Sequence, residues 1–257
     1  MRRRKFRAIA VCMMAAAGLM LASCGVADVV NQAVAEVVQE VTGVAIDEMG
    51  GGPRVNLGVG DMDSLDLQVG LVNNAVSIQT HGDNTVRVYF SPPLTGNYVI
   101  PTVEIVPLTN RIEVTEPSGI TFGANYRPGV LFVYLPEAMV ADNLDLRTTN
   151  GAVRVVGIDN RLTDSVSVAV VNGVTELRHF NADNISATST NGTISANSIA
   201  ADSLEMRTTN GFITARDSAV SGNLVARTVN GGVTLENVDA DMGRADVNAV
   251  NGVVTVR

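Results

Sequence analysis

The feature that most constrains this chain is an Asn-Gly pair that recurs through its second half. Six copies follow one another at spacings of 22, 19, 19, 20 and 21 residues. They are Asn150-Gly151, Asn172-Gly173, Asn191-Gly192, Asn210-Gly211, Asn230-Gly231 and Asn251-Gly252. A period of this length is typical of proteins in which one supersecondary unit stacks on the next. The spacing therefore predicts a stacked-repeat architecture.

Apolar residues form columns when the copies are aligned on their asparagines. In the first copy the columns hold Leu144 and Leu146 before the corner, and Val153 and Val155 after it. The intervening positions are mostly polar, so each copy reads as a strand, an Asn-Gly corner, a second strand and a longer, variable corner. One coil cannot bury its own columns, but coils stacked at about 4.8 Å per rung make a continuous core. The columns therefore predict an all-β, single-domain β-solenoid (β-helix) with coils of about 20 residues.

A meander of β-hairpins is the rival structure, because Asn-Gly is the strongest short hairpin signal. A meander also needs a tight turn at its other end, whereas here that corner is longer and varies in length. Fixed columns on both strands fit parallel stacking better. In the solenoid, Asn and Gly suit the corner because both tolerate positive φ, and stacked Asn side chains can hydrogen-bond as a ladder. Antiparallel pairing across the Asn-Gly pairs would contradict the solenoid.

Residues 54–140 show strand alternation without the regular repeat. Val72-Asn73-Asn74-Ala75 resembles a degenerate Asn-Gly coil. All eight prolines lie between Pro53 and Pro136, where they set turns and strand edges. We predict that residues 54–140 form N-terminal β coils and a cap over the first open rung, followed by the six-coil region at residues 141–257.

The first 23 residues have the parts of a secretory signal peptide: a basic run, an uncharged apolar stretch and small residues. The stretch ends in Leu21-Ala22-Ser23-Cys24, which resembles the lipobox of bacterial lipoproteins. The resemblance implies cleavage after Ser23 and diacylglycerol on the sulfur of Cys24, and hence a lipid-anchored protein of the bacterial cell envelope, at the outer membrane or a periplasmic face. An ordinary signal peptide with an incidental cysteine is the alternative.

Residues 24–53 are predicted to space the lipidated cysteine from the β domain. Valines recur there at three- and four-residue steps, which indicates an amphipathic helix. Valine is a mediocre helix former, so a flexible tether is the alternative. The run Gly50-Gly51-Gly52-Pro53 marks the domain boundary.

Processing makes the chain strongly acidic. Loss of the signal peptide removes five of 18 basic residues and none of 26 acidic ones, which leaves a formal charge of −13. Such a chain does not suit nucleic acid or an anionic membrane surface, so the lipid on Cys24 would hold it to the membrane. Cys12 leaves with the signal, so no thiol remains for a disulfide or a cysteine-ligated metal.

Two segments carry a family resemblance. They are Val133-Tyr134-Leu135-Pro136 and the run from Leu144 to Val155, followed by its degenerate copies. Over roughly residues 65–257 the chain resembles the bacterial DUF4097 family, whose adhesin label is itself an inference. The resemblance implies a β-solenoid at the cell envelope and carries no assigned catalytic residues and no cofactor.

The candidate metal site is a column of acidic residues eight positions before the asparagines. It consists of Asp142, Asp164, Asp183 and Asp202. Carboxylates on adjacent rungs repel one another, and Ca²⁺ would relieve this repulsion. The column continues as Gly222 and Gly243, which favours a turn role, with each Asp accepting hydrogen bonds from its own backbone. His81 and His179 lack a metal-ligand spacing, and a surface or corner position is expected for His179.

The candidate binding face is an outward column of arginines on the first strand. It consists of Arg147, Arg207 and Arg227, with Asp145 and Glu205 two residues before the first two. A solvated face of paired charges is the simpler interpretation, and a surface for acidic glycans is the alternative.

Two classes of function remain. The first is a non-enzymatic envelope protein whose stacked face binds an envelope protein or glycan, or serves adhesion or scaffolding. The second is a polysaccharide-acting enzyme or a calcium-stabilised glycan-binding β-helix, which is an analogy at the level of the fold. Such an enzyme needs a carboxylate pair in a groove and usually aromatic platforms for sugars. The chain has no Trp and a uniform repeat, which favours the first class.

Overall fold

The computed structural model describes residues 54–58, 65–106, 110–117, 126–240 and 244–257. The predicted signal peptide, Cys24 and the helical or flexible tether lie outside these residues and stay predictions. All regular elements within the described residues are strands, and none of them includes a helix long and apolar enough to cross a bilayer.

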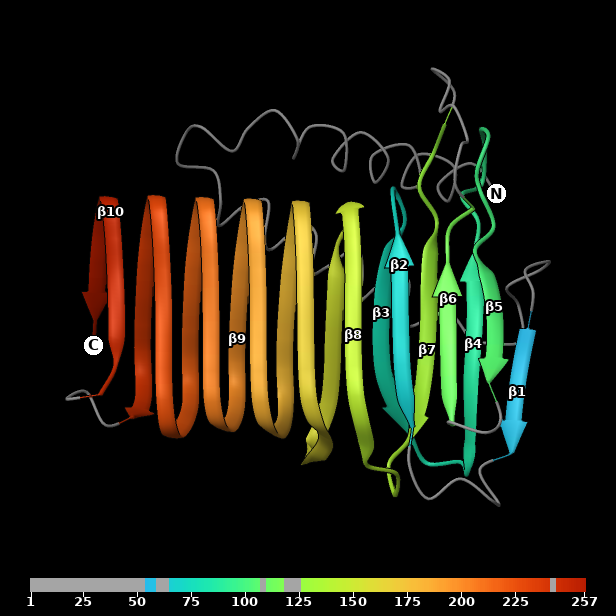
Figure 1. Cartoon of the computed structure of the whole chain (residues 1–257), viewed down its shortest axis with the longest axis horizontal. Coiled ribbons are helices and arrows are strands. Elements are labelled where there is room, and N and C mark those ends of the chain that lie inside the picture. Colours follow the sequence, from blue (N-terminus) through green and yellow to red (C-terminus); the bar gives the residue numbers. More distant parts are fainter. Residues whose placement is uncertain (1–53, 59–64, 107–109, 118–125, 241–243) are drawn as a thin grey trace, which may run out of the picture. The chain divides into compact units, whose positions relative to one another are not determined.

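Ten strands form one continuous sheet that winds around a narrow core (Figure 1). They are β1 (Arg54–Gly58), β2 (Asp66–Leu71), β3 (Ala75–His81), β4 (Thr85–Ser91), β5 (Thr102–Val106), β6 (Arg111–Thr115), β7 (Val130–Pro136), β8 (Ala141–Asn150), β9 (Val153–Ala240) and β10 (Asp246–Val256). The 88 residues of β9 are one extended ribbon that passes through successive coils without leaving the sheet.

Parallel pairing confirms the solenoid. β8 pairs with β9 in a parallel register that places Leu144 on Val166 and Asn150 on Asn172. β10 pairs with β9 in the same way, with Asn251 on Asn230. The Asn-Gly pairs are therefore corners of stacked coils and not hairpin turns. We call each coil a rung, with a first strand that ends at the Asn and a second strand that follows the Gly.

Stacking order differs from chain order at the N-terminal end. β2 and β3 make the rung next to the start of the repeat, because they pair in parallel with β8 and β9. The next rung outward is β6 and β7, which come later in the chain and pair in parallel with β2 and β3. β5 then pairs antiparallel with β6, β4 antiparallel with β7, and β1 antiparallel with β4. Antiparallel strands therefore cover this end of the stack.

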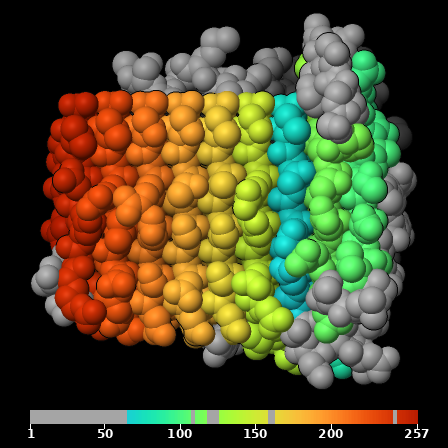
Figure 2. Space-filling view, viewed as in Figure 1, coloured from blue at the N-terminus to red at the C-terminus, as the bar shows by residue number. Residues whose placement is uncertain are grey.

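The core consists of small and medium side chains that lie between the two strands of each rung and stack in columns from rung to rung. The first strands contribute columns such as Leu144, Val166, Ile185, Leu204 and Leu224, each at most 2% exposed. The second strands contribute a facing column that includes small residues, with Ala196 and Ala215 fully buried. Successive rungs lie side by side as regular bands in Figure 2. Phe180 also lies fully in the core.

Candidate functional site

The Asn-Gly corners form one unbroken ladder of side-chain amides. Each Asn donates Nδ2–H to the Oδ1 of the Asn on the preceding rung, at 2.7–2.8 Å. The ladder contains Asn73, Asn150, Asn172, Asn191, Asn210, Asn230 and Asn251. It confirms the predicted ladder and extends it by one rung to Asn73, in the segment that resembled a degenerate coil.

The glycines are required by close approach of the backbones. A Cβ added to Gly173 would overlap the carbonyl oxygen of Gly151, far inside the 3.0 Å that Cβ atoms keep from their neighbours. The same overlap recurs up the stack at Gly192, Gly211, Gly231 and Gly252. Positive φ was the wrong reason for the asparagines, because none of the ladder asparagines adopts it. The corner therefore selects Gly for space and Asn for its amide.

A column of threonines supports the same corner from inside. Thr148 Oγ1 donates to Asn74 O at 3.1 Å, Thr208 Oγ1 to Gly192 O at 3.3 Å, and Thr228 Oγ1 to Gly211 O at 3.2 Å. All three threonines are buried. Sequence reasoning missed this column, although Thr recurs two positions before the Asn in these copies.

The second corner is marked by residues with left-handed backbones, seven positions after four of the ladder asparagines. They are His179, Ser198, Asp217 and Asn237, with φ between 47° and 55°. His, Asp and Asn are among the non-glycine residues that enter this region most readily. Asn237 Nδ2 donates to Asp217 Oδ1 at 2.7 Å, a second and shorter side-chain ladder. His179 lies in this corner, where a surface or corner position was expected for it.

The acidic column lies along the edge that leads into the first strands. Asp142, Asp164 and Asp202 are exposed and Asp183 is half-buried. Asp202 Oδ1 accepts a hydrogen bond from Ser221 Oγ at 2.6 Å. Within the described ranges, no three His, Cys, Asp or Glu side chains come together in a way that could hold a metal ion. At Gly222 an added Cβ would come too close to Asp202 O, which explains why Gly replaces Asp on that rung.

Each arginine of the candidate binding face is paired with a carboxylate. Arg147 binds Asp145 within its own strand, with Nη2 2.9 Å from Oδ2. Arg207 pairs with Glu205 in the same way, and Arg227 pairs with Asp246 of the next rung. The hydrogen bond to Asp145 raises the pKa of Arg147. The face is therefore a pattern of paired charges on the outside of the first strands.

A half-buried charge cluster on the outside of the second strands was not singled out from the sequence. Arg154 Nε lies 3.1 Å from Glu176 Oε2, and Arg178 pairs with the other oxygen of Glu176. Burial lowers the pKa of Arg154. Arg and Glu stand in the same column of adjacent copies, four residues after Asn150 and Asn172, and this was the available signal.

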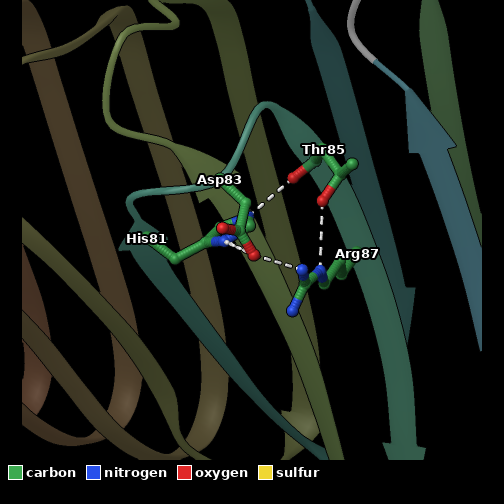
Figure 3. Close-up of polar contacts among 4 residues, drawn as sticks. All are labelled: His81, Asp83, Thr85 and Arg87. Carbon is green, nitrogen blue, oxygen red and sulfur yellow. Dashed lines mark hydrogen bonds and ion pairs between the residues drawn. The ribbon is translucent and has the colours of Figure 1, made fainter.

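The loop between β3 and β4, two strands that flank β7 in the sheet, holds a polar cluster (Figure 3). His81 Nε2 donates to Thr85 O at 2.6 Å, and Arg87 Nε donates to Thr85 Oγ1 at 3.1 Å. Asp83 pairs with Arg87 and lies 3.7 Å from His81 Nδ1. Every member comes from residues 81–87, which contain the turn and its flanks in β3 and β4, so the cluster fixes the turn that leads to the covering strand β4.

The N-terminal start of the ladder rests on a buried carboxylate. Glu116 is 7% exposed, and its Oε2 accepts the backbone N–H of Val72 at 2.7 Å and of Asn73 at 3.2 Å. Burial and the charge of Glu116 raise the pKa of Tyr126 to about 12. Asn74, fully buried, accepts from Gly129 N–H at 2.7 Å and from Tyr126 Oη–H at 3.3 Å. Glu116 directly follows β6, so on the β6–β7 rung a carboxylate meets the first ladder corner where the inner rungs have a corner asparagine.

A comparison with protein-family models identifies the family of this chain. A family model described as Toastrack DUF4097 matches residues 73–257, so the chain belongs to that family. A crystal structure titled "putative adhesin" from Bacteroides fragilis is similar at 13% identity, covering 80% of this chain and 96% of that one, with a TM-score of 0.44. A "putative cell adhesion protein" from Clostridium sporogenes is similar at 10% identity, covering 80% and 99%, with a TM-score of 0.38. These two likenesses carry no argument for function, and no curated protein matches the chain.

Proposed function

We propose that this member of the Toastrack DUF4097 family is a lipid-anchored bacterial envelope protein that acts by binding or scaffolding and not by catalysis. The observation that carries the proposal is the register of the rungs. Because Asn stacks on Asn from Asn73 to Asn251, outward side chains of equal position also stack in straight columns. Such a surface presents its outward side chains at the regular rung spacing of about 4.8 Å.

The outward columns of the first strands supply a surface for binding. Between the paired arginines lie short hydroxyl side chains, including Ser167, Ser186 and Thr188. Paired charges and hydroxyls make a flat surface that carries both positive and negative side chains. Such a surface can form hydrogen bonds with a long, repetitive partner. A glycan or an extended envelope protein of similar spacing is the partner that this pattern fits.

The anchor is proposed from residues outside the described part of the chain. The four residues that end in Cys24 follow an apolar stretch at the position expected of a lipobox. Residues 24–53 would then space the solenoid from the membrane. Acyl chains hold a protein to a bilayer in proportion to the methylene groups that they bury, so lipid on Cys24 would be sufficient without a spanning helix.

Lipid attachment is tested by exchanging the two cysteines separately. Cys24→Ala should abolish incorporation of a labelled fatty acid and release the protein from the membrane fraction. Cys12→Ala is the matched control, because Cys12 lies in the part that cleavage would remove, and it should leave both readouts unchanged. Equal lipid incorporation in the Cys24→Ala variant would contradict the anchor.

Binding is tested with isolated cell envelopes from a strain that lacks the protein. We expect saturable binding of the wild-type chain, reduced by a triple variant with Arg147→Ala, Arg207→Ala and Arg227→Ala. Arg216→Ala is the control, because Arg216 pairs with Glu236 on the second strands and not on this face. Absence of saturable binding, or turnover of an acidic polysaccharide, would contradict the proposal.

A further inference from the structure

Among the described residues, the rung that contains β10 has a partner strand on one side only. β10 pairs with β9 and, within the described residues, with no further strand (Figure 1). It contains neither Pro nor Lys, two residues that commonly protect a sheet edge from pairing. An edge of this kind is a template for another strand.

Exposed apolar side chains gather on the same rung. Val250 is 68% exposed, Val253 69%, Val254 41% and Val256 54%. Together they form the largest concentration of exposed aliphatic side chains on any rung of the described chain. Contiguous apolar surface of this kind marks a contact with another protein more often than a surface left in water.

The backbone groups of β10 that face the open side follow from the hydrogen bonds that the chain already makes. Arg257 donates its N–H to Leu235 O at 2.9 Å and accepts from Asn237 N–H at 3.1 Å, so both its groups face β9. Because backbone groups alternate along a strand, those of Val254 and Val256 face the open side.

In the first half of β10, the backbone groups that face the open side can be inferred from the other first strands. In β2, the outward residues Asp66 and Gly70 direct their backbone groups toward the preceding rung, through Asp66 N–H to Asn110 O and Glu116 N–H to Gly70 O. In the same columns of β10, the inward residues Val247 and Ala249 therefore present their N–H and C=O groups to the open side.

We infer that a second copy of this chain docks on this edge, with the two β10 strands antiparallel and corner against corner. One register satisfies both the backbone and the side chains. It places Val247 opposite Val256 of the second copy and Ala249 opposite Val254, so residues whose backbone groups face the open side meet each other and their side chains continue the core.

The outward side chains are complementary in the same register. Val250 lies opposite Val253 of the second copy, which covers the two most exposed valines. Asp246 lies opposite Arg257 of the second copy, so the two-fold axis creates two such ion pairs. Both strands of the rung are used, and the contact is isologous and closes on itself, as a homodimer requires.

The dimer should be weak because its interface is small. β10 has 11 residues, compared with roughly 20–30 residues a side in a standard interface. The full chain in density-matched detergent should therefore show a reversible monomer–dimer equilibrium by sedimentation equilibrium. A monomer at all concentrations up to about 1 mM, where binding free energies fall to about 4 kcal/mol, would overturn the inference.

Two sets of variants test the register. Val256→Pro removes an N–H on the open side and should weaken dimerisation about tenfold or more without lowering the melting temperature. Thr255→Pro, whose N–H faces β9, should lower the melting temperature. Asp246→Arg and Arg257→Asp should each weaken the dimer about tenfold through like-charge contact, and the double variant should restore it. A dimer insensitive to Val256→Pro, or a double variant as weak as the single ones, would overturn this interface.

Discussion

The two ends of the solenoid are built differently. At the N-terminal end, β5 and β4 pair antiparallel with the outermost rung, and the Glu116 carboxylate accepts backbone N–H groups of the first ladder corner. At the other end, β10 has a single neighbour within the described part of the chain, and Asn251 is the last ladder residue there, with valines exposed around it. The repeat thus determines how rungs stack, whereas the termination of the stack depends on residues outside the repeat.

The largest expected effect tests whether interior rungs are held more tightly than the last one. Gly211→Ala should lower the free energy of unfolding by about 3 kcal/mol, because the new Cβ overlaps Gly192 O between two fixed rungs. Gly252→Ala creates the same overlap with Gly231 O, but the last rung can shift, so about 1 kcal/mol is expected. Chemical denaturation measures both, and equal losses would mean that the last rung is as constrained as the interior.

The next effect concerns the cap. Glu116→Ala should cost about 2 kcal/mol, because two backbone N–H groups lose a charged acceptor. Glu104→Ala is the matched control, since Glu104 is an exposed residue of the covering strand β5. Denaturant midpoints compare the two variants. If the Glu116 variant were as stable as the control, Glu116 would not support the start of the ladder.

A smaller difference is expected within the ladder itself. The side chain of Asn210 makes two ladder hydrogen bonds, one donated to Asn191 and one accepted from Asn230, whereas the side chain of Asn251 makes one. Asn210→Ala should therefore cost about 1.5 kcal/mol and Asn251→Ala about half as much. Thermal denaturation of the two variants gives the ratio, and a larger loss at Asn251 would contradict the ladder account.

The smallest effect is a pH dependence confined to the capped end. The pKa of Tyr126 rises from 10.0 to about 12 in the folded chain, so the unfolded chain loses this proton first as the pH rises. Stability from this group is complete below pH 10 and declines between about pH 10 and pH 12, by about 0.5 kcal/mol after allowing for solvent screening. Tyr126→Phe should remove that share of the decline in urea denaturation, and an unchanged profile would exclude Tyr126 as its source.

Much of the repeat could be predicted from the sequence because it depends on local periodicity. The column of Leu144 and its equivalents, the parallel register and the Asn ladder each need only the spacing of the asparagines. The physical reason for glycine at the Asn-Gly corners could not be predicted from this spacing. Gly173 is required by Gly151 O on another rung, a contact that exists only after stacking.

The capped end could not be predicted in detail because its contacts are distant and occur once. Glu116 meets Val72 across 44 residues, and nothing repeats to reveal the pairing. The β6–β7 rung also stacks outside the β2–β3 rung that precedes it in the chain, which strand alternation alone does not show.

At the other end of the stack, the salt bridge from Arg227 to Asp246 joins two rungs, whereas the sequence suggested pairs within one strand.

Parallel stacking in register is the central claim, and engineered disulfides test it most directly. Thr190 and Thr209 are exposed and stand one position before the ladder asparagines of adjacent rungs. Their Cα atoms should lie about 4.8 Å apart, within the range that a disulfide bridges. Thr190→Cys with Thr209→Cys should oxidise to an intramolecular disulfide, while Thr190→Cys with Val229→Cys, two rungs apart, should not. A disulfide in the second pair, or none in the first, would contradict the stacked solenoid.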